Sequence, residues 1–399
     1  MKRSKKIILG LVLLVIVLGS VSLFTFNKLI QPATNEVQNS TTVNNGETST
    51  NSTTSNSTSE SQETTETSEE PEENPYEGTF ELPIKNASGY APIDLEVKSQ
   101  ADSDAETEET LEPGTAFRIL QEEDDWWEIE SEETQGWIEH QYAFINLPDV
   151  LPSAAYNNTN TYSSLYRSVG IEIPEVTDHS LYDSKAENER LGKEEFIIPV
   201  LYTTAKKIYE AQSQALENGE TLLIYETYRP HNAQEKVYDQ LTELAEENDT
   251  VKAGADTAPW EMFWFINDDV SNHQKGFAID VSLAQIDEQE TNFYGDYSVD
   301  VVEDYTEYEM PSPMHELSSA SAVFTQPVTS LDEDAWKDAE LRPEMNQAAL
   351  ALQGYFVNAG MTPLASEWWH FNDLEAREQV EDNESNGEYT LKEVMSTTP

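Results

Sequence analysis

A long apolar segment near the N-terminus most constrains how this chain can fold. Residues 7–26 contain only apolar residues, Gly, Ser and Thr, and they follow a basic cluster that comprises Lys2, Arg3, Lys5 and Lys6. At about 1.5 Å per residue, a helix of this length crosses the roughly 30 Å hydrocarbon layer of a membrane. The positive flank predicts a cytoplasmic tip and an extracellular remainder, so residues 1–31 are expected to form a single-pass membrane anchor. A cleaved signal peptide is the alternative, but no A-x-A-like site follows the segment.

Residues 32–75 are dominated by Ser, Thr, Asn and Glu and contain almost no large apolar side chain. Such a segment cannot bury enough surface to offset its chain entropy, so it is predicted to be a disordered spacer. The whole chain carries 77 acidic and 22 basic residues, a net charge of −55. This polyanion repels phosphate backbones, which excludes a nucleic-acid partner held by basic contacts. The chain has no Cys, so any metal has to be held by His, Asp or Glu.

Residues 76–148 show short strand patterns separated by acidic turns and by turns that contain Gly or Pro. The expected strands cover residues 116–120, 126–130 and 136–138. This pattern resembles a bacterial SH3-like domain, a small antiparallel all-β barrel, and the resemblance implies a module that binds the cell wall or positions the protein on it. Trp127 and Trp137 are expected either to fill the small core or to stack on a ligand.

Residues 150–399 mix helical and strand signals, which predicts an α+β domain made of an antiparallel sheet with helices. The pattern predicts helices from Pro199 to Gly219, across 237–244 and across 345–356, with a buried strand at 221–225. Residues 285–328 form an acidic, Tyr-rich segment with three prolines and little periodicity. This segment is expected to be either an insertion that covers a cleft or a mobile lid.

Three short segments of this domain carry residues suited to hydrolysis. They are Ser271–Ser282, Tyr228–Pro230 and Glu367–His370. After Gly276, strand alternation places Asp280 on the face opposite Phe277, Ile279 and Val281, and His273 can converge with Asp280 only across the Gly276 turn. A hydrolytic zinc site needs three protein ligands, an open position and a carboxylate base. The candidate ligands are His273, Asp280 and His370, with Glu367 as the base and Arg229 as the cation that stabilises an oxyanion.

The pattern Ser271-x-His273-x-x-Gly276-x-Ala278-x-Asp280, followed by Glu367-x-x-His370, resembles the zinc D-Ala-D-Ala peptidases. These comprise the VanY-type carboxypeptidases and the VanX-type dipeptidases. The resemblance covers residues 190–375, and it implies zinc bound by His273, Asp280 and His370, with Glu367 as general base and Arg229 at the transition state. Ser271, Tyr228 and Trp369 are the residues expected to contact the substrate; the alternative for Ser271 is an N-cap or turn role, and the alternative for Trp369 is a place in the cleft wall and core.

The motif details resemble the dipeptidase branch, whereas the anchor, spacer and wall module resemble the carboxypeptidase branch. We therefore expect an exported, membrane-anchored enzyme that removes the terminal D-alanine from peptidoglycan stem peptides. A D,D-dipeptidase, an endopeptidase with the same site, and an inactive wall-binding protein are the alternatives. Arg229 has a structural alternative as the partner of a carboxylate. The remaining histidines are expected to be ordinary core or surface residues, with His231 near enough to Arg229 to support the site; these are His140, His179, His231 and His315.

Overall fold

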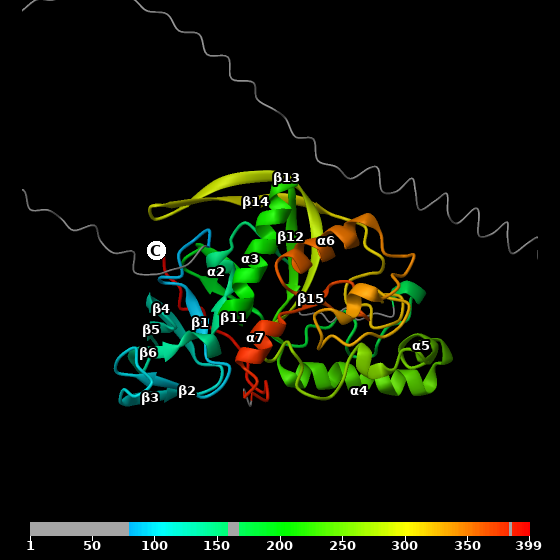
Figure 1. Cartoon of the computed structure of the whole chain (residues 1–399), viewed down its shortest axis with the longest axis horizontal. Helices are drawn as coiled ribbons and strands as arrows, with labels where there is room; N and C mark the ends of the chain where they lie inside the picture. Colours follow the sequence, from blue (N-terminus) through cyan, green and yellow to red (C-terminus); the bar gives the residue numbers. More distant parts are fainter. Residues whose placement is uncertain (1–79, 159–166, 383–384) are drawn as a thin grey trace, which may run out of the picture. The chain divides into compact units, whose positions relative to one another are not determined.

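The computed structural model describes residues 80–158, 167–382 and 385–399 (Figure 1). The predicted anchor at 1–31 and the predicted spacer at 32–75 lie outside these ranges. Within the described residues, no helix has both the length and the apolar character needed to span a membrane.

The described chain forms an all-β SH3-like region followed by a mixed α+β domain. The first region contains β1 (Ser88–Tyr90), β2 (Leu95–Lys98), β3 (Thr107–Leu111), β4 (Ala116–Glu123), β5 (Trp126–Glu130), β6 (Gln135–Glu139), η1 (His140–Tyr142), β7 (Phe144–Asn146) and α2 (Leu147–Val150). The next part contains β8 (Ala155–Tyr156), η2 (Arg167–Val169), β9 (Lys185–Asn188), β10 (Lys193–Phe196), β11 (Pro199–Leu201), α3 (Tyr202–Glu217), β12 (Glu220–Glu226), α4 (His231–Glu247), α5 (Asp249–Ala255) and η3 (Met262–Trp264). The last part contains β13 (Ala278–Tyr294), β14 (Tyr297–Glu307), η4 (Ala335–Asp338), α6 (Gln347–Asn358), β15 (Thr362–Pro363), β16 (His370–Asn372) and α7 (Leu374–Gln379).

The SH3-like region is built on an antiparallel sheet in the order β11-β7-β1-β4-β5-β6-β2-β3. The three strands expected from the sequence lie within β4, β5 and β6. Alternation along β5 buries Trp127 completely while Trp126 stays half-buried, so Trp127 fills the core rather than a ligand site. Trp137 is half-buried.

The sheet of the first region also takes a strand from the second. Pro199 pairs with Asn146 and Leu201 pairs with Phe144, so β11 extends the sheet beyond β7. The predicted helix therefore starts at Tyr202, three residues later than expected. Helical spacing could not reveal the strand partner, which comes from residues more than fifty positions earlier. The expected stop at Gly219 is confirmed, since Gly219 has φ +73° directly after α3.

The α+β domain has a sheet in the order β15-β16-β13-β12-β8, with β14 paired to β13. Every neighbouring pair is antiparallel except β8 with β12. The predicted strand at 221–225 lies within β12, and the predicted helix at 237–244 lies within α4. The predicted helix at 345–356 overlaps α6. Figure 1 shows α3 and α6 beside this sheet, and the ring of Phe356 on α6 stacks on Phe371 of β16 at 4.4 Å. This packing fixes the strands that carry the site.

The segment at 285–328, expected to be either an insertion that covers a cleft or a mobile lid, contains a regular pair of strands. Its first half continues β13 and returns as β14, forming the long hairpin drawn in yellow in Figure 1. The buried side chains Val299 and Val301 alternate with exposed ones and pack with Leu82 of the first region. The acidic exposed face concealed this period of two in the sequence. The second half, after β14, contacts the segment that precedes β16, since the amide of Val323 donates to the carbonyl of Ala365 at 2.9 Å.

Gly276 offers a direct test of how tightly the turn before β13 is packed. Its φ is +79°, and a Cβ there would lie 2.1 Å from Cε1 of Phe144. We expect Gly276→Ala to lower the free energy of unfolding by about 2–5 kcal/mol, because about 1–2 kcal/mol of left-handed strain adds to about 1–3 kcal/mol of overpacking. Gly219→Ala is the matched control, since it has φ +73° with open space around it. Urea denaturation measures both, and equal losses would contradict the packing argument.

Candidate metal centre and active site

Two neighbouring strands bring the first two candidate ligands together. Asp280 on β13 stands directly opposite His370 on β16. Oδ1 of Asp280 lies 2.9 Å from Nδ1 of His370, and both side chains are buried. The register of the antiparallel pair therefore places these two groups within bonding distance of one ion.

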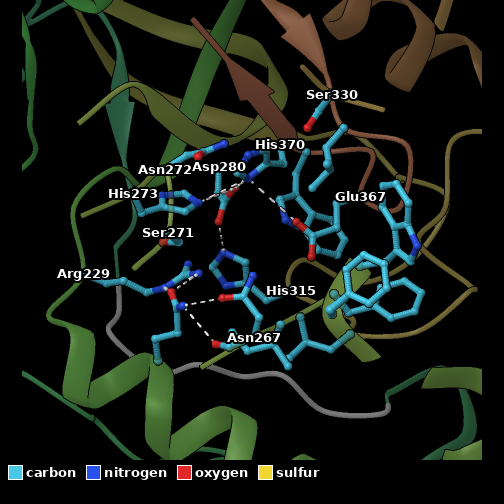
Figure 2. Close-up of a pocket in the computed structure, with 18 of the residues that line it drawn as sticks. Arg229, Asn267, Ser271, Asn272, His273, Asp280, His315, Ser330, Glu367 and His370 are labelled. Carbon is cyan, nitrogen blue, oxygen red and sulfur yellow. Dashed lines mark hydrogen bonds and ion pairs between the residues drawn. The ribbon is translucent and has the colours of Figure 1, made fainter. Parts of the chain in front are cut away.

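His273 reaches the same point through the turn before β13. The amide of Gly276 donates to the carbonyl of His273 at 3.1 Å, and the amide of Phe277 donates to the carbonyl of Asn272 at 3.3 Å. The turn leaves Nε2 of His273 3.2 Å from Nδ1 of His370 and 3.5 Å from Oδ1 of Asp280. Figure 2 shows the three side chains pointing toward one another. The turn at Gly276 thus brings His273 and Asp280 together, as the sequence analysis predicted.

The outer nitrogens of both imidazoles are held by groups that accept hydrogen bonds. Nδ1 of His273 donates to the carbonyl of Thr227 at 2.6 Å, and Nε2 of His370 donates to Oδ1 of Asn372 at 3.1 Å. In the neutral rings, the inner nitrogens then carry lone pairs that face each other beside a carboxylate. Lone pairs and an anion at such distances repel one another unless a cation or a proton lies among them.

A zinc ion fits this donor set. Tetrahedral zinc with Zn–N distances of about 2.0–2.1 Å separates two ligand nitrogens by about 3.3 Å, close to the 3.2 Å between the imidazoles. The second hydrogen bond of each ring is the support that metal-bound histidines usually have. The atoms offered by His273, Asp280 and His370 all lie within 4.8 Å of one another, so these residues form a buried group able to hold a metal.

Electrostatics disfavour a proton on His273 and favour an ionised Asp280. Burial lowers the pKa of His273, which opposes protonation of its ring. Burial alone disfavours the charged form of Asp280, but its contacts with His273, His315 and His370 outweigh burial and hold the pKa of Asp280 well below its usual range. A neutral His273 ring and an ionised Asp280 are the forms of these two groups that bind metal.

Glu367 lies beside the metal group. Its Oε2 is 3.8 Å from Nδ1 of His370, and among the described residues its carboxylate accepts no hydrogen bond. Burial and the charge of Asp280 raise the pKa of Glu367 well above its usual range, while Arg229 opposes this shift. A carboxylate with a raised pKa can take a proton from water and return it near neutral pH.

Arg229 is a buried cation at the edge of the same cavity. Its Nη1 donates to Oε2 of Glu226 at 2.7 Å, and its Nε and Nη2 donate to Oε1 of Gln234 at 3.1 and 3.0 Å. The carboxylate partner proposed as an alternative from the sequence is therefore present, yet Arg229 also lines the cavity. The two descriptions are compatible, because the ion pair orients the guanidinium.

The cavity has a volume of about 350 Å³ and is open to solvent at one side. Its walls include the metal group, Glu367 and Arg229, together with Ser271 and Trp369. The hydroxyl of Ser271 donates to Oε1 of Gln274 at 2.7 Å, and its amide donates to the same oxygen, so Ser271 supports a turn while it lines the wall. Trp369 is buried and contributes an edge of the wall.

Tyr228, expected to contact substrate, does not line this cavity. Its ring stacks on Tyr389 at 4.8 Å, and its hydroxyl donates toward the carbonyls of Tyr389 and Gly387. The C-terminal segment that covers Tyr228 is more than 150 residues away in sequence, so no local pattern announced it. In the structure, Tyr228 therefore packs against this segment and lies outside the cavity lining.

His315 is a site residue that the sequence reasoning missed. It was expected to be an ordinary core or surface residue, but its Nε2 lies 3.2 Å from Oδ2 of Asp280 and it lines the cavity. No motif spacing marks it, since it comes from the second half of the 285–328 segment. The only signal was its rarity, as one of six histidines in 399 residues. By contrast, Nε2 of His140 bonds to Asp124, Nε2 of His231 bonds to Asp268, and His179 is exposed.

Comparison with known proteins supports the SH3-like assignment of the first region. Residues 96–142 match the bacterial SH3 domain family, a domain that suggests cell-wall binding. The match spans β2 to η1 and thus a minor part of the chain. No peptidase family is identified, and no curated protein matches the chain.

The candidate metal site predicts that zinc binding depends on His273 and His370. Removal of one of three ligands should abolish tight binding, so His273→Ala and His370→Ala should lose the zinc that the wild-type chain retains at about one ion per chain. His179→Ala is the control, because His179 is exposed and distant from the site in sequence. Metal content after dialysis, measured by plasma mass spectrometry, gives the ratio. Equal zinc in the control and in both ligand variants would contradict this assignment.

Proposed function

We propose that the protein is an exported, membrane-anchored zinc peptidase that hydrolyses the terminal D-Ala-D-Ala bond of peptidoglycan stem peptides and releases D-alanine. One observation carries the proposal: the buried group of His273, Asp280 and His370 shares a cavity with Glu367 and Arg229. Ligands, a carboxylate base and a fixed cation are the parts that hydrolysis of a peptide bond requires.

His273, Asp280 and His370 would hold the zinc ion. Bound there, zinc supplies Lewis acidity toward the scissile carbonyl and the attacking water. Glu367 takes one proton from that water while the water oxygen forms a bond to the carbonyl carbon. When the C–N bond breaks, Glu367 returns the proton to the departing amine of D-alanine, so it ends the cycle ionised as it began.

Arg229 faces the charge that develops on the carbonyl oxygen. Its contacts with Glu226 and Gln234 hold the guanidinium before substrate arrives, and a cation that needs no reorganisation stabilises a transition state more than a mobile one. The chain has only 22 basic residues, so this buried cation stands out against a strongly acidic background. Its position supports a role beyond the ion pair.

The SH3-like region would keep the enzyme on its substrate polymer. A groove of about 300 Å³ lies on this region, and its lining includes the half-buried aromatic side chains Trp126 and Tyr142. Half-buried aromatic rings of this kind provide flat apolar contacts for sugars and peptides. The N-terminal anchor and spacer expected from the sequence would place both regions outside the cell, on either interpretation of the N-terminal segment.

The central test is D-alanine release from a pentapeptide that ends in D-Ala-D-Ala. We expect zinc-loaded wild-type protein to release it, and Glu367→Gln to retain zinc while the turnover rate falls about 10²–10⁴-fold, because the base is lost and the ligands remain. Glu243→Gln, at an exposed position on α4, should keep full turnover. Mass spectrometry of the products and plasma mass spectrometry of the metal measure these effects.

The product identifies the bond. Release of free D-alanine would support the proposed carboxypeptidase activity. Release of a D-Ala-D-Ala dipeptide or of longer fragments would instead indicate an endopeptidase that acts within the stem peptide. Cleavage of free D-Ala-D-Ala together with an intact pentapeptide would instead establish a D,D-dipeptidase. Wall binding without hydrolysis of any of these substrates would support the alternative that the protein is an inactive wall-binding protein.

A further inference from the structure

We propose that His315 is a positioning residue of the metal centre, which holds one oxygen of Asp280 so that the other oxygen faces the metal. This inference rests on the metal-binding part of the proposed function and not on which bond is cleaved. It extends the site beyond the two sequence motifs to the loop that follows β14.

The two oxygens of Asp280 have different partners. Oδ1 lies near the inner nitrogens of His370 and His273, at 2.9 and 3.5 Å. Oδ2 lies 3.2 Å from Nε2 of His315 (Figure 2). Rotation about the last bond of an Asp side chain is soft, so an unsupported carboxylate can turn or offer both oxygens to a metal. A donor on Oδ2 removes this freedom and leaves Oδ1 for the metal.

The ring of His315 is itself fixed by packing. It is 6% exposed, and it contacts Trp369 edge-on at 5.9 Å and Tyr225 edge-on at 6.2 Å. Trp369 directly precedes the ligand His370, with which β16 begins, so one wall of the His315 ring adjoins a metal ligand in sequence. A ring locked in this way can orient a carboxylate, whereas an exposed ring cannot.

The backbone indicates that this placement is imposed by the fold. His315 has φ +57°, a left-handed conformation that is uncommon outside Gly and persists only where the surroundings demand it. The loop is anchored on both sides of His315. Trp368 donates to the hydroxyl of Ser312 at 3.0 Å, and Glu316 accepts from the amide and hydroxyl of Ser168 at 3.1 and 2.8 Å.

A direct ligand role for His315 is the competing description. Atoms of Glu226, Asp280 and His315 also lie within 4.8 Å of one another, which would suit a second ion. However, Oε2 of Glu226 accepts from Arg229 at 2.7 Å and Oε1 accepts from Tyr182 at 2.7 Å. Both oxygens are therefore engaged, and the guanidinium repels a second cation at that point. These contacts favour positioning over ligation.

The test compares two substitutions of similar size in the full chain. His315→Gln keeps an N–H donor that can reach Asp280, and His315→Leu removes it, while both carry the same backbone strain. Zinc affinity is measured by competition with a chromogenic chelator, with His179→Ala as the control. We expect His315→Leu to bind one zinc about 10–100-fold more weakly than wild type and His315→Gln to recover most of that loss. Metal-free melting temperatures should be similar in the two variants.

Several results would overturn the inference. Wild-type affinity in His315→Leu would remove any role for the residue, and equal weakening in both folded variants would exclude the hydrogen bond as its cause. Two zinc ions in wild type with one lost in His315→Leu would make His315 a ligand of a second ion. A wild-type chain that binds no zinc would overturn this inference and the proposed function together, whereas normal zinc binding without hydrolysis would reject only the proposed activity.

Discussion

The candidate site of the C-terminal domain is built around a local electrostatic conflict that a bound cation would relieve. Two buried imidazole nitrogens face each other at 3.2 Å beside an ionised carboxylate. Hydrogen bonds to Thr227 and Asn372 keep the ring protons on the far side, and burial opposes adding another proton to His273. Without a positive charge this arrangement is repulsive, so the fold holds it at a cost that a bound metal ion would offset.

The same packing that builds the site joins it to the SH3-like region. The turn at Gly276, which delivers His273, has no space for a side chain because Phe144 of β7 lies against it. Next to this contact, β11 extends the sheet of the first region. The C-terminal segment then closes the arrangement, since the hydroxyl of Tyr90 donates to the carbonyl of Glu393 at 3.0 Å. The SH3-like region packed in this way shares its core with the turn that shapes the candidate metal centre.

Local patterns anticipated much of the architecture. Alternation and turn residues predicted β4, β5, β6 and β12, and helical spacing predicted α4 and α6. The errors occurred where a distant partner decided the conformation. Pro199 became a strand because β7 was available to pair with it, and the acidic 285–307 stretch became a hairpin whose buried face packs on Leu82. Tyr228 was covered by the C-terminal segment for the same reason.

The sequence by itself limited the donor chemistry: with no Cys, a metal has to be held by His, Asp or Glu, and short motifs marked a His-Asp-His group with Glu367 as the candidate set. Residue types and short spacings record such chemistry because the turn and the strand periodicity act within a few positions. Only the tertiary structure decided that His315 contacts Asp280 and that Arg229 is paired with Glu226 while it lines the cavity. These contacts depend on the register of separate strands and on the path of a loop, which arise from long-range packing and leave no local signal.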